Sequence, residues 1–385
     1  MDFEITDDQK VMVAAIREML DHVADADYLR RLDEEERYPE EVWDALAADG
    51  WLGLPVPTEY GGLGGNIVDV VLVVEELARR MTALGTMYLT SSCFGTNSIG
   101  AYGSDEQKRL LLPKIARGEL RFCFGVTEPN TGVDTLSLTT TAKRDGDEWV
   151  INGQKVFITG ADVADYIVLL TRTTKEVAKR SQGLTIFMVP RESAGIEVRP
   201  MKKLGLKAIH TCEVFLDDVR VAADHVLGEV DRGWEFILHT MNNERITVSA
   251  YRLGNARAAL EDAVAYAKET ERFGKPIGQF QSIQHRLAET YVMIDVARLA
   301  VHRAAWLQSQ GRPCGREAAI AKYFSSEVVV KAAETGMRVM AGYGYMTENP
   351  MQRYYRDAIL APTGTATQEL LLSYLGESLG LPKSY

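Results

Sequence analysis

The stretch Leu136-Ser-Leu-Thr-Thr-Thr-Ala-Lys-Arg-Asp-Gly-Asp-Glu-Trp-Val-Ile-Asn-Gly-Gln-Lys-Val-Phe-Ile-Thr159 separates two long helical regions and decides the fold class. Asp145-Gly146 and Asn152-Gly153 are dipeptides that favour tight turns between antiparallel strands, so each predicts a hairpin. Runs rich in β-branched and aromatic residues follow at residues 166–170, 184–189 and 212–216. Short strands at this spacing predict a small β-barrel or sandwich over residues 121–231.

Helical patterns fill both flanks of this β region. Before it, Thr6 with Gln9 three residues later is typical of a helix cap, and further helices are expected over residues 39–48 and 67–80. After it, long helices are expected over residues 234–268, 282–310, 315–341 and 368–380. We therefore predict an α+β multidomain chain with an N-terminal helical domain (1–120), a middle β domain (121–231) and a C-terminal four-helix bundle (232–385).

Composition narrows the functional class. The 385 residues carry a net charge of -11, which argues against a nucleic-acid-binding surface. Cys93, Cys123, Cys212 and Cys314 are widely spaced, and with six scattered histidines they form no zinc or disulfide motif. The acidic amino terminus does not resemble a signal peptide, and no apolar run is long enough to span a bilayer, so we expect a cytoplasmic protein.

Five segments, taken in order, resemble motifs of the acyl-CoA dehydrogenase family. They are Gly125-Val-Thr-Glu-Pro-Asn-Thr-Gly-Val-Asp134, Ile151-Asn-Gly-Gln-Lys-Val-Phe-Ile-Thr-Gly160, Arg272-Phe-Gly-Lys-Pro-Ile-Gly-Gln-Phe-Gln281, Ala341-Gly-Tyr-Gly344 and Tyr355-Arg-Asp-Ala358. The resemblance covers essentially the whole chain. Met1-Asp-Phe and Tyr38-Pro-Glu-Glu-Val-Trp look most like bacterial members that act on short or unusual acyl-CoA thioesters, including crotonobetainyl-CoA-reductase-like proteins.

The resemblance implies a specific reaction. In the family a base removes the α-proton of an acyl-CoA thioester while the β-hydride passes to N5 of FAD, and electrons continue to an electron-transfer flavoprotein. The family's assembly is a homotetramer, a dimer of dimers, in which two subunits share each FAD site. Because the α-proton is only weakly acidic, the developing charge on the thioester oxygen must meet hydrogen-bond donors that are already in place.

The closing motif departs from the family at the position of its usual base. Residues 353–369 read Arg-Tyr-Tyr-Arg-Asp-Ala-Ile-Leu-Ala-Pro-Thr-Gly-Thr-Ala-Thr-Gln-Glu. Many members carry a glutamate before Gly-Thr here, whereas an ungapped count places Thr365 at the glutamate position and Ala366-Thr367 after it. The backbone N–H of Thr365 survives this replacement, so it remains a candidate donor to the thioester oxygen.

Glu244 is the candidate for a relocated base. It lies on an apolar helical stripe with Ile237, Met241, Val248 and Tyr251, and no cation stands three or four residues away. Apolar surroundings raise a carboxyl pKa, which suits a general base, although an ion pair with a distant arginine is an equal alternative from periodicity alone. Glu244-Arg245 also resembles the pair in isovaleryl- and long-chain-type members, which take their base from this helix.

The resemblance assigns the remaining site residues. Asn242 and Arg245 would contact the pantetheine arm of CoA, and a helix with Tyr88, Thr90 and Phe94 would line the acyl pocket. Residues near the flavin would be Val126, Thr127, Gly132, Val133, Phe157, Thr159 and Thr367. Residues that bind the adenine and pyrophosphate end of a neighbouring subunit's FAD would be Arg272, Phe273, Gln281, Arg338 and Gly342. Without the resemblance, Val126 and Phe157 would be interpreted as hairpin core.

Three hypotheses stay open at this point. The first is a dehydrogenase with Glu244 as its base, and the second is an enoyl-CoA reductase built from the same groups. The third is a non-catalytic subunit that completes a partner's FAD site, which is favoured by the departures at Thr365, Val133 and Thr270. No metal site is expected.

Overall fold

The computed structural model describes residues 4–383, and its N-terminal part is helical, as the periodicity predicts. Thr6 and Gln9 form the expected reciprocal cap at the start of α1, and α4 has the predicted limits. Seven α-helices and one π-helical segment follow one another: α1 (Asp7–Val23), α2 (Ala26–Glu35), α3 (Glu40–Ala48), α4 (Ile67–Arg80), α5 (Thr82–Tyr88), the π-helical segment Leu89–Phe94, α6 (Gly95–Tyr102) and α7 (Asp105–Ala116).

The middle part is one eight-stranded sheet. Its strands are β1 (Phe122–Gly125), β2 (Thr141–Asp145), β3 (Glu148–Thr159), β4 (Tyr166–Arg172), β5 (Leu184–Pro190), β6 (Ile196–Pro200), β7 (Thr211–Ala222) and β8 (Val226–Leu227). The order is β6-β7-β3-β2-β4-β5-β8, and β1 pairs in parallel with β4. Two separate hydrophobic clusters include residues of this sheet. One contains Trp149 and Phe187. The other contains Phe122 and Leu184 and extends to α7 and the start of α8.

One of the two predicted hairpin turns is wrong. Asp145-Gly146 does join β2 to β3, but Asn152-Gly153 lies inside β3, which continues to Thr159. The register with β7 shifts at this point: the single residue Asn152 of β3 lies opposite Asp217 and Asp218, so β7 forms a bulge here. Glycine is needed because a Cβ at Gly153 would lie 2.4 Å from the Thr140 hydroxyl oxygen. The Asn152 side chain exchanges hydrogen bonds with Asp218 across the bulge.

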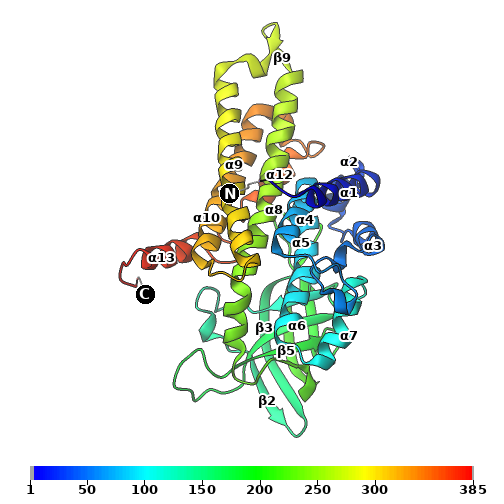
Figure 1. Cartoon of the computed structure of the whole chain (residues 1–385), viewed down its shortest axis with the longest axis vertical. Coiled ribbons are helices and arrows are strands. Elements are labelled where there is room, and N and C mark those ends of the chain that lie inside the picture. The colour runs from blue at the N-terminus through cyan, green and yellow to red at the C-terminus, as the bar shows by residue number, and fades with distance from the viewer. Residues whose placement is uncertain (1–3, 384–385) are drawn as a thin grey trace.

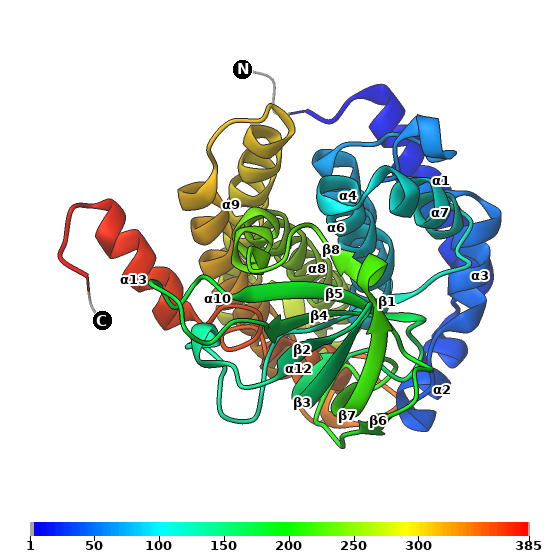
Figure 2. The ribbon, with the colours of Figure 1, turned by 90° about the horizontal axis from the view of Figure 1, so that it is seen from below.

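The C-terminal part is a bundle of long antiparallel helices, as predicted. It contains α8 (Gly233–Glu269), the small hairpin β9 (Glu271–Arg272) and β10 (Lys275–Pro276), α9 (Gln281–Ser309), α10 (Gly315–Met340), α11 (Gly342–Tyr345), α12 (Met351–Ala358) and α13 (Gln368–Ser378). Figure 1 shows α8 running along the long axis from the sheet to the β9 tip. Figure 2 places the N-terminal helices on one side of α8 and α9, α10 and α13 on the other. Within residues 4–383, no helix has the length and apolarity of a membrane span.

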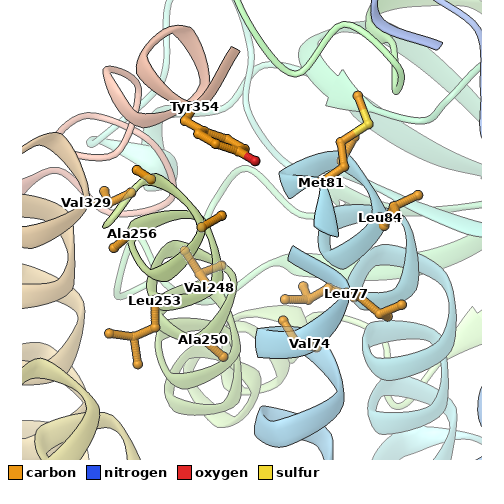
Figure 3. Packing of buried hydrophobic residues seen from close by; sticks show 14 of the residues in the cluster. Val74, Leu77, Met81, Leu84, Val248, Ala250, Leu253, Ala256, Val329 and Tyr354 are labelled. Atoms are coloured by element: carbon orange, nitrogen blue, oxygen red, sulfur yellow. The ribbon is translucent and has the colours of Figure 1, made fainter. Parts of the chain in front are cut away.

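Helices α4 and α8 pack closely against each other in this core. Figure 3 shows side chains of α4, α5 and α8, such as Val74, Leu84 and Leu253, meeting in one apolar cluster. At Gly254 on α8, a Cβ would lie 2.3 Å from the Glu75 carbonyl oxygen and 2.7 Å from the Arg79 nitrogen. The two helix backbones therefore approach to a distance that no side chain at residue 254 permits.

Buried ion pairs also hold α4 and α8 together. Arg257 of α8 donates to Glu75 at 2.7 Å and to Glu76 at 2.8 Å, and Arg17 of α1 reaches Glu76 at 2.7 Å. Burial by itself raises the pKa of Glu75, but His302, Arg298 and Arg257 outweigh burial and lower that pKa to about 2. Because removal of one partner leaves a buried charge uncompensated, this network favours one rotation of α8 on α4.

We predict that Gly254→Ala destabilises the protein by about 2 kcal/mol or more, because its methyl group meets backbone atoms that cannot move aside. Gly100→Ala is the matched control, since Gly100 lies in α6 with open space around its Cβ position. The control is expected to be neutral or to stabilise slightly. Chemical denaturation of both variants measures the difference, and equal stabilities would contradict the close packing of α4 and α8.

Candidate active site

Glu244 lies on the face of α8 that turns toward α10 and is partly buried. Among the residues that the structure describes, no cation lies within ion-pairing distance (4 Å) of its carboxylate. Burial raises the pKa of Glu244 to about 7, and the charges of Arg245 and Lys322 offset only part of this rise. A carboxyl group with this pKa gains and loses a proton readily near neutrality, which is the requirement for a general base.

Lys322 of α10 is the second ionisable group of this site, and the sequence analysis missed it. Its side chain is fully buried, and its Nζ donates to the carbonyl oxygens of Ala361 and Ala366. Burial and the nearby Arg252 and Arg245 charges lower the pKa of Lys322 to about 7, although Glu244 opposes that shift. The lysine follows three apolar residues in a helical pattern, so its sequence context gave no sign of a polar environment.

The loop after α12 carries Thr365, which has a positive φ of 63° that non-glycine residues rarely adopt. The carbonyls of Ala361, Gly364 and Ala366 turn inward to the side chains of Lys322 and Arg252. Thr365 itself is exposed, and no hydrogen-bond partner of its backbone N–H lies within residues 4–383. The structure thus places this loop against α10 through Lys322, whose charge also acts on Glu244.

Asn242 and Arg245 lie on the same part of α8. Asn242 faces the start of α10 near Gly315, and the Arg245 guanidinium lies 5.5 Å from the centre of the Tyr374 ring on α13. Arg245 is buried, yet its Nε has no hydrogen-bond partner in the part of the chain that the structure describes. The two polar groups leave donors and acceptors free next to Glu244.

The Phe157 side chain is held outward from the sheet by a bulge within β3. Phe157 has a φ of 61°, its side chain is 62% exposed, and the register with β7 shifts between Lys155 and Ile158. A left-handed aromatic residue costs roughly 1–3 kcal/mol, so such geometry is found mainly where function requires it. The expectation of a hairpin-core phenylalanine, which holds without the family resemblance, is wrong because the bulge turns the ring to the surface.

A buried ion pair fixes the segment Val126–Glu128 to β3, the strand that carries Phe157. Lys155 is fully buried and donates to the Glu128 carboxylate at 2.9 Å and to the Val126 carbonyl at 3.1 Å. Val156 N–H donates to the Thr127 carbonyl at 3.0 Å. Burial alone would raise the pKa of Glu128, but Lys155 and hydrogen bonds from Thr140 and Thr139 lower it to about 2. Residues 126–128 are therefore fixed to β3 on the side of Phe157.

The other residues expected near a flavin have mixed surroundings. Gly132 and Val133 are exposed in the loop after Thr131, and Thr159 pairs with Thr211 at the end of β3. The Thr367 hydroxyl accepts a hydrogen bond from Leu370 N–H at 3.3 Å and so caps α13. Its side chain already has a structural role, which leaves its backbone as the part that can contact another group.

The residues expected at the adenine end lie far from Phe157 within one chain. Arg272 and Phe273 occupy the β9 tip, at the opposite end of α8 from the sheet (Figure 1). Phe273 is 96% exposed with a φ of 54°, and Gln281 begins α9. Arg338 forms an exposed ion pair with Glu334 at 2.6 Å, and Gly342 is exposed in the next turn. Within one chain, the residues expected near the flavin therefore lie apart from those expected at the adenine end.

Tyr88, Thr90 and Phe94 belong to a helix that changes type. Thr90 and Phe94 lie in the π-helical segment Leu89–Phe94, and such segments widen a helix and are frequent at functional sites. Tyr88 is fully buried and donates to the Trp51 carbonyl at 2.9 Å, so its hydroxyl is already satisfied within the protein. Phe94 packs edge-on against Phe124 at 5.4 Å, next to the strand that leads to Val126.

Comparison with known proteins agrees with this architecture. The chain matches the family descriptions "Acyl-CoA dehydrogenase, N-terminal domain" over residues 6–119, "Acyl-CoA dehydrogenase, middle domain" over 123–219 and "Acyl-CoA dehydrogenase, C-terminal domain" over 231–380. The chain belongs to the acyl-CoA dehydrogenase family. It is therefore an oxidoreductase of a flavoprotein family with three domains, as the sequence motifs predict.

Individual members of this acyl-CoA dehydrogenase family resemble the chain over nine tenths or more of its length. Benzylmalonyl-CoA dehydrogenase of Aromatoleum aromaticum is 38% identical, with 96% of this chain and 97% of that protein covered. The 3-(aryl)acrylate reductase of Clostridium sporogenes is 34% identical, with coverages of 90% and 92%. The solved structure of butyryl-CoA dehydrogenase from Megasphaera elsdenii superposes with a TM-score of 0.94 at 32% identity, covering 99% of this chain and 100% of that chain.

We predict that Lys155→Met destabilises the protein by about 3–5 kcal/mol, because it leaves the Glu128 carboxylate buried without a counter-ion. The double variant Glu128→Gln, Lys155→Met removes both charges and is expected to lose less, measured by urea denaturation. Since the folded-state pKa of Glu128 is lowered from 4.5 to about 2, the pair's stabilisation is present above pH 4.5 and is lost as the pH falls toward 2. A pH-independent difference between wild type and double variant over that window would exclude this role.

Proposed function

We propose that this chain is an FAD-dependent acyl-CoA dehydrogenase in which Glu244 removes the α-proton of the thioester. The observation that carries the proposal is a carboxylate without an ion-pair partner among residues 4–383, whose pKa burial raises to about 7. Because Glu244 on α8 would provide the base, Thr365 needs to contribute only its backbone N–H. Deprotonated Glu244 accepts the α-proton, and the nearby Lys322 and Arg245 charges favour its carboxylate form.

The oxygen of the thioester carbonyl requires a donor while the α-proton leaves. The exposed Thr365 N–H, which lacks a partner within the described chain, supports this assignment. Asn242 and Arg245, which border Glu244 with unpaired polar atoms, are proposed to bind the pantetheine arm. Tyr88, Thr90 and Phe94 are proposed to bound the acyl group, since the π-helical segment places Phe94 against Phe124.

The middle domain offers a fit for FAD. The outward Phe157 ring, the exposed Val133 and Gly132, and the segment Val126–Thr127 that Lys155 fixes would hold the flavin together with Thr159 and the backbone at Thr367. When bound there, FAD would supply the acceptor for the β-hydride of the acyl group, with an electron-transfer flavoprotein as the proposed destination of the electrons. Strand β3, which carries Phe157, and the β9 tip lie at opposite ends of the molecule (Figure 1), and this supports a homotetramer in which Arg272, Phe273, Gln281, Arg338 and Gly342 serve a neighbouring subunit's FAD.

An enoyl-CoA reductase is the second candidate, and the similarity to the 3-(aryl)acrylate reductase favours it. The same Glu244 would then return a proton to the α-carbon. Anaerobic titration with a panel of acyl-CoAs and enoyl-CoAs separates the two directions, because a dehydrogenase's flavin absorbance bleaches with the saturated thioester. A chain that purifies without flavin and bleaches with no thioester would instead indicate a non-catalytic subunit.

We predict that Glu244→Gln lowers kcat by roughly 10²–10⁴-fold while flavin is retained, because the amide cannot accept a proton. Thr365→Ala is the matched control: it preserves the backbone N–H and is expected to keep most of the activity. Steady-state rates and the 450 nm absorbance band are the readouts. Full activity in Glu244→Gln would refute Glu244 as the base, and loss in Thr365→Ala alone would return the role to the loop.

The pH profile provides a separate prediction. Because only the carboxylate form of Glu244 accepts a proton, kcat/KM is expected to rise with pH and to reach half its maximum near the pKa of about 7. The charge of Lys322 lowers that pKa, so Lys322→Met is expected to move the half-maximum upward by about one unit. A shift to lower pH, or none in a folded variant, would contradict the electrostatic coupling of the two residues.

A further inference from the structure

Arg252 is a buried cation that the proposed reaction does not yet use. It is 1% exposed, lies on α8 two turns beyond Glu244, and has no carboxylate within ion-pairing distance among residues 4–383. Its Nε has no hydrogen-bond partner within the same described residues. Burying an unpaired guanidinium is costly, so the contacts that it does make identify what the charge acts on.

Those contacts lead to the loop that carries Thr365. Arg252 Nη1 donates to the Ser326 hydroxyl at 2.9 Å, and Nη2 donates to the Gly364 carbonyl at 3.3 Å. Ser326 in turn donates to the Lys322 carbonyl at 2.6 Å, so it does not depend on Arg252 for a partner. Arg252 also lies 5.7 Å from the centre of the neighbouring Tyr251 ring on α8, so the Gly364 carbonyl is the contact that joins this arginine to the loop.

The Gly364 carbonyl and the Thr365 N–H belong to one peptide unit. Peptide bonds between the described residues are all trans, so the N–H points in the direction opposite to the carbonyl. With its oxygen directed inward to Arg252, this unit directs the Thr365 N–H away from the protein core, where no acceptor from residues 4–383 meets it. A cation at the carbonyl end also polarises the amide and strengthens its N–H as a donor.

We propose that Arg252 is a positioning residue that orients and polarises the Gly364–Thr365 peptide, so that the Thr365 N–H binds the thioester carbonyl oxygen more strongly as negative charge develops there. This inference rests on the proposed function. Arg252 touches neither substrate nor base, and it shares one rigid helix with Glu244. The α-proton acceptor and the charge behind the oxygen donor are consequently held at a fixed separation of about 12 Å along α8.

The test measures the infrared stretching frequency of the thioester carbonyl of butyryl-CoA, labelled with carbon-13 at that carbon. The ligand is bound to flavin-containing Glu244→Gln protein, which is expected not to remove the α-proton. Infrared difference spectra are compared for this protein and for the same protein with Arg252→Met or Arg252→Lys. The expected result is a bound frequency below that of free butyryl-CoA, which loses most of its downshift with methionine and recovers with lysine. Should the methionine variant not fold, Arg252→Gln takes its place.

Kinetics of the single Arg252 variants complete the test. Removal of a whole oxyanion donor costs about 10²–10³-fold in kcat, so a weakened donor is expected to cost roughly 10-fold in kcat with a smaller change in KM. An unchanged downshift in the Arg252→Met protein would overturn the role of Arg252 and leave the proposed function intact. The absence of any downshift in the Glu244→Gln protein itself would overturn the proposed function and this inference together.

Discussion

The close contact between α4 and α8 at Gly254 is the constraint on which the rest of the structure depends. Because α8 carries Glu244, Arg245 and Arg252, its position sets the geometry of the whole candidate site. The backbone contact fixes the distance between the two helices, and the Arg257 pairs with α4 fix the rotation of α8 about its axis. A helix that is held in both respects can present a carboxylate toward α10 without an ion pair to anchor it.

Periodicity and turn chemistry predicted the architecture well and failed where backbone geometry is unusual. The long helices and most strands follow from local pattern, and the family match confirms the three-domain class, whereas the domain limits at 120 and 231 stay a prediction. Asn152-Gly153 is the common signal of a hairpin, yet β3 continues through it and pairs with β7, which forms a bulge opposite Asn152. No sequence signal marks the left-handed Phe157, because its conformation depends on that same pairing.

The candidate site was only partly accessible from sequence for a different reason. Glu244 stood out because a lone carboxylate interrupts an apolar stripe, and its raised pKa agrees with that interpretation, although its role as the base stays a prediction. Lys322 and Arg252 act through backbone carbonyls of a loop more than 35 residues away, at Gly364 and Ala366. Side chain to backbone contacts at such separation leave no spacing pattern, so only the folded structure identifies them.

The arrangement also explains how a base can change its position within this fold. The α-proton acceptor and the carbonyl donor are different chemical groups, and a terminal-motif glutamate supplies both from a single residue. In the proposed site the backbone N–H stays at Thr365 while the carboxylate comes from α8, and Lys322 connects the two regions through its charge near Glu244 and its hydrogen bonds to the loop. The carboxylate base can come from either of two elements that border the substrate site, because it is a side chain. The N–H donor stays with its loop, because the backbone conformation of that loop sets its direction.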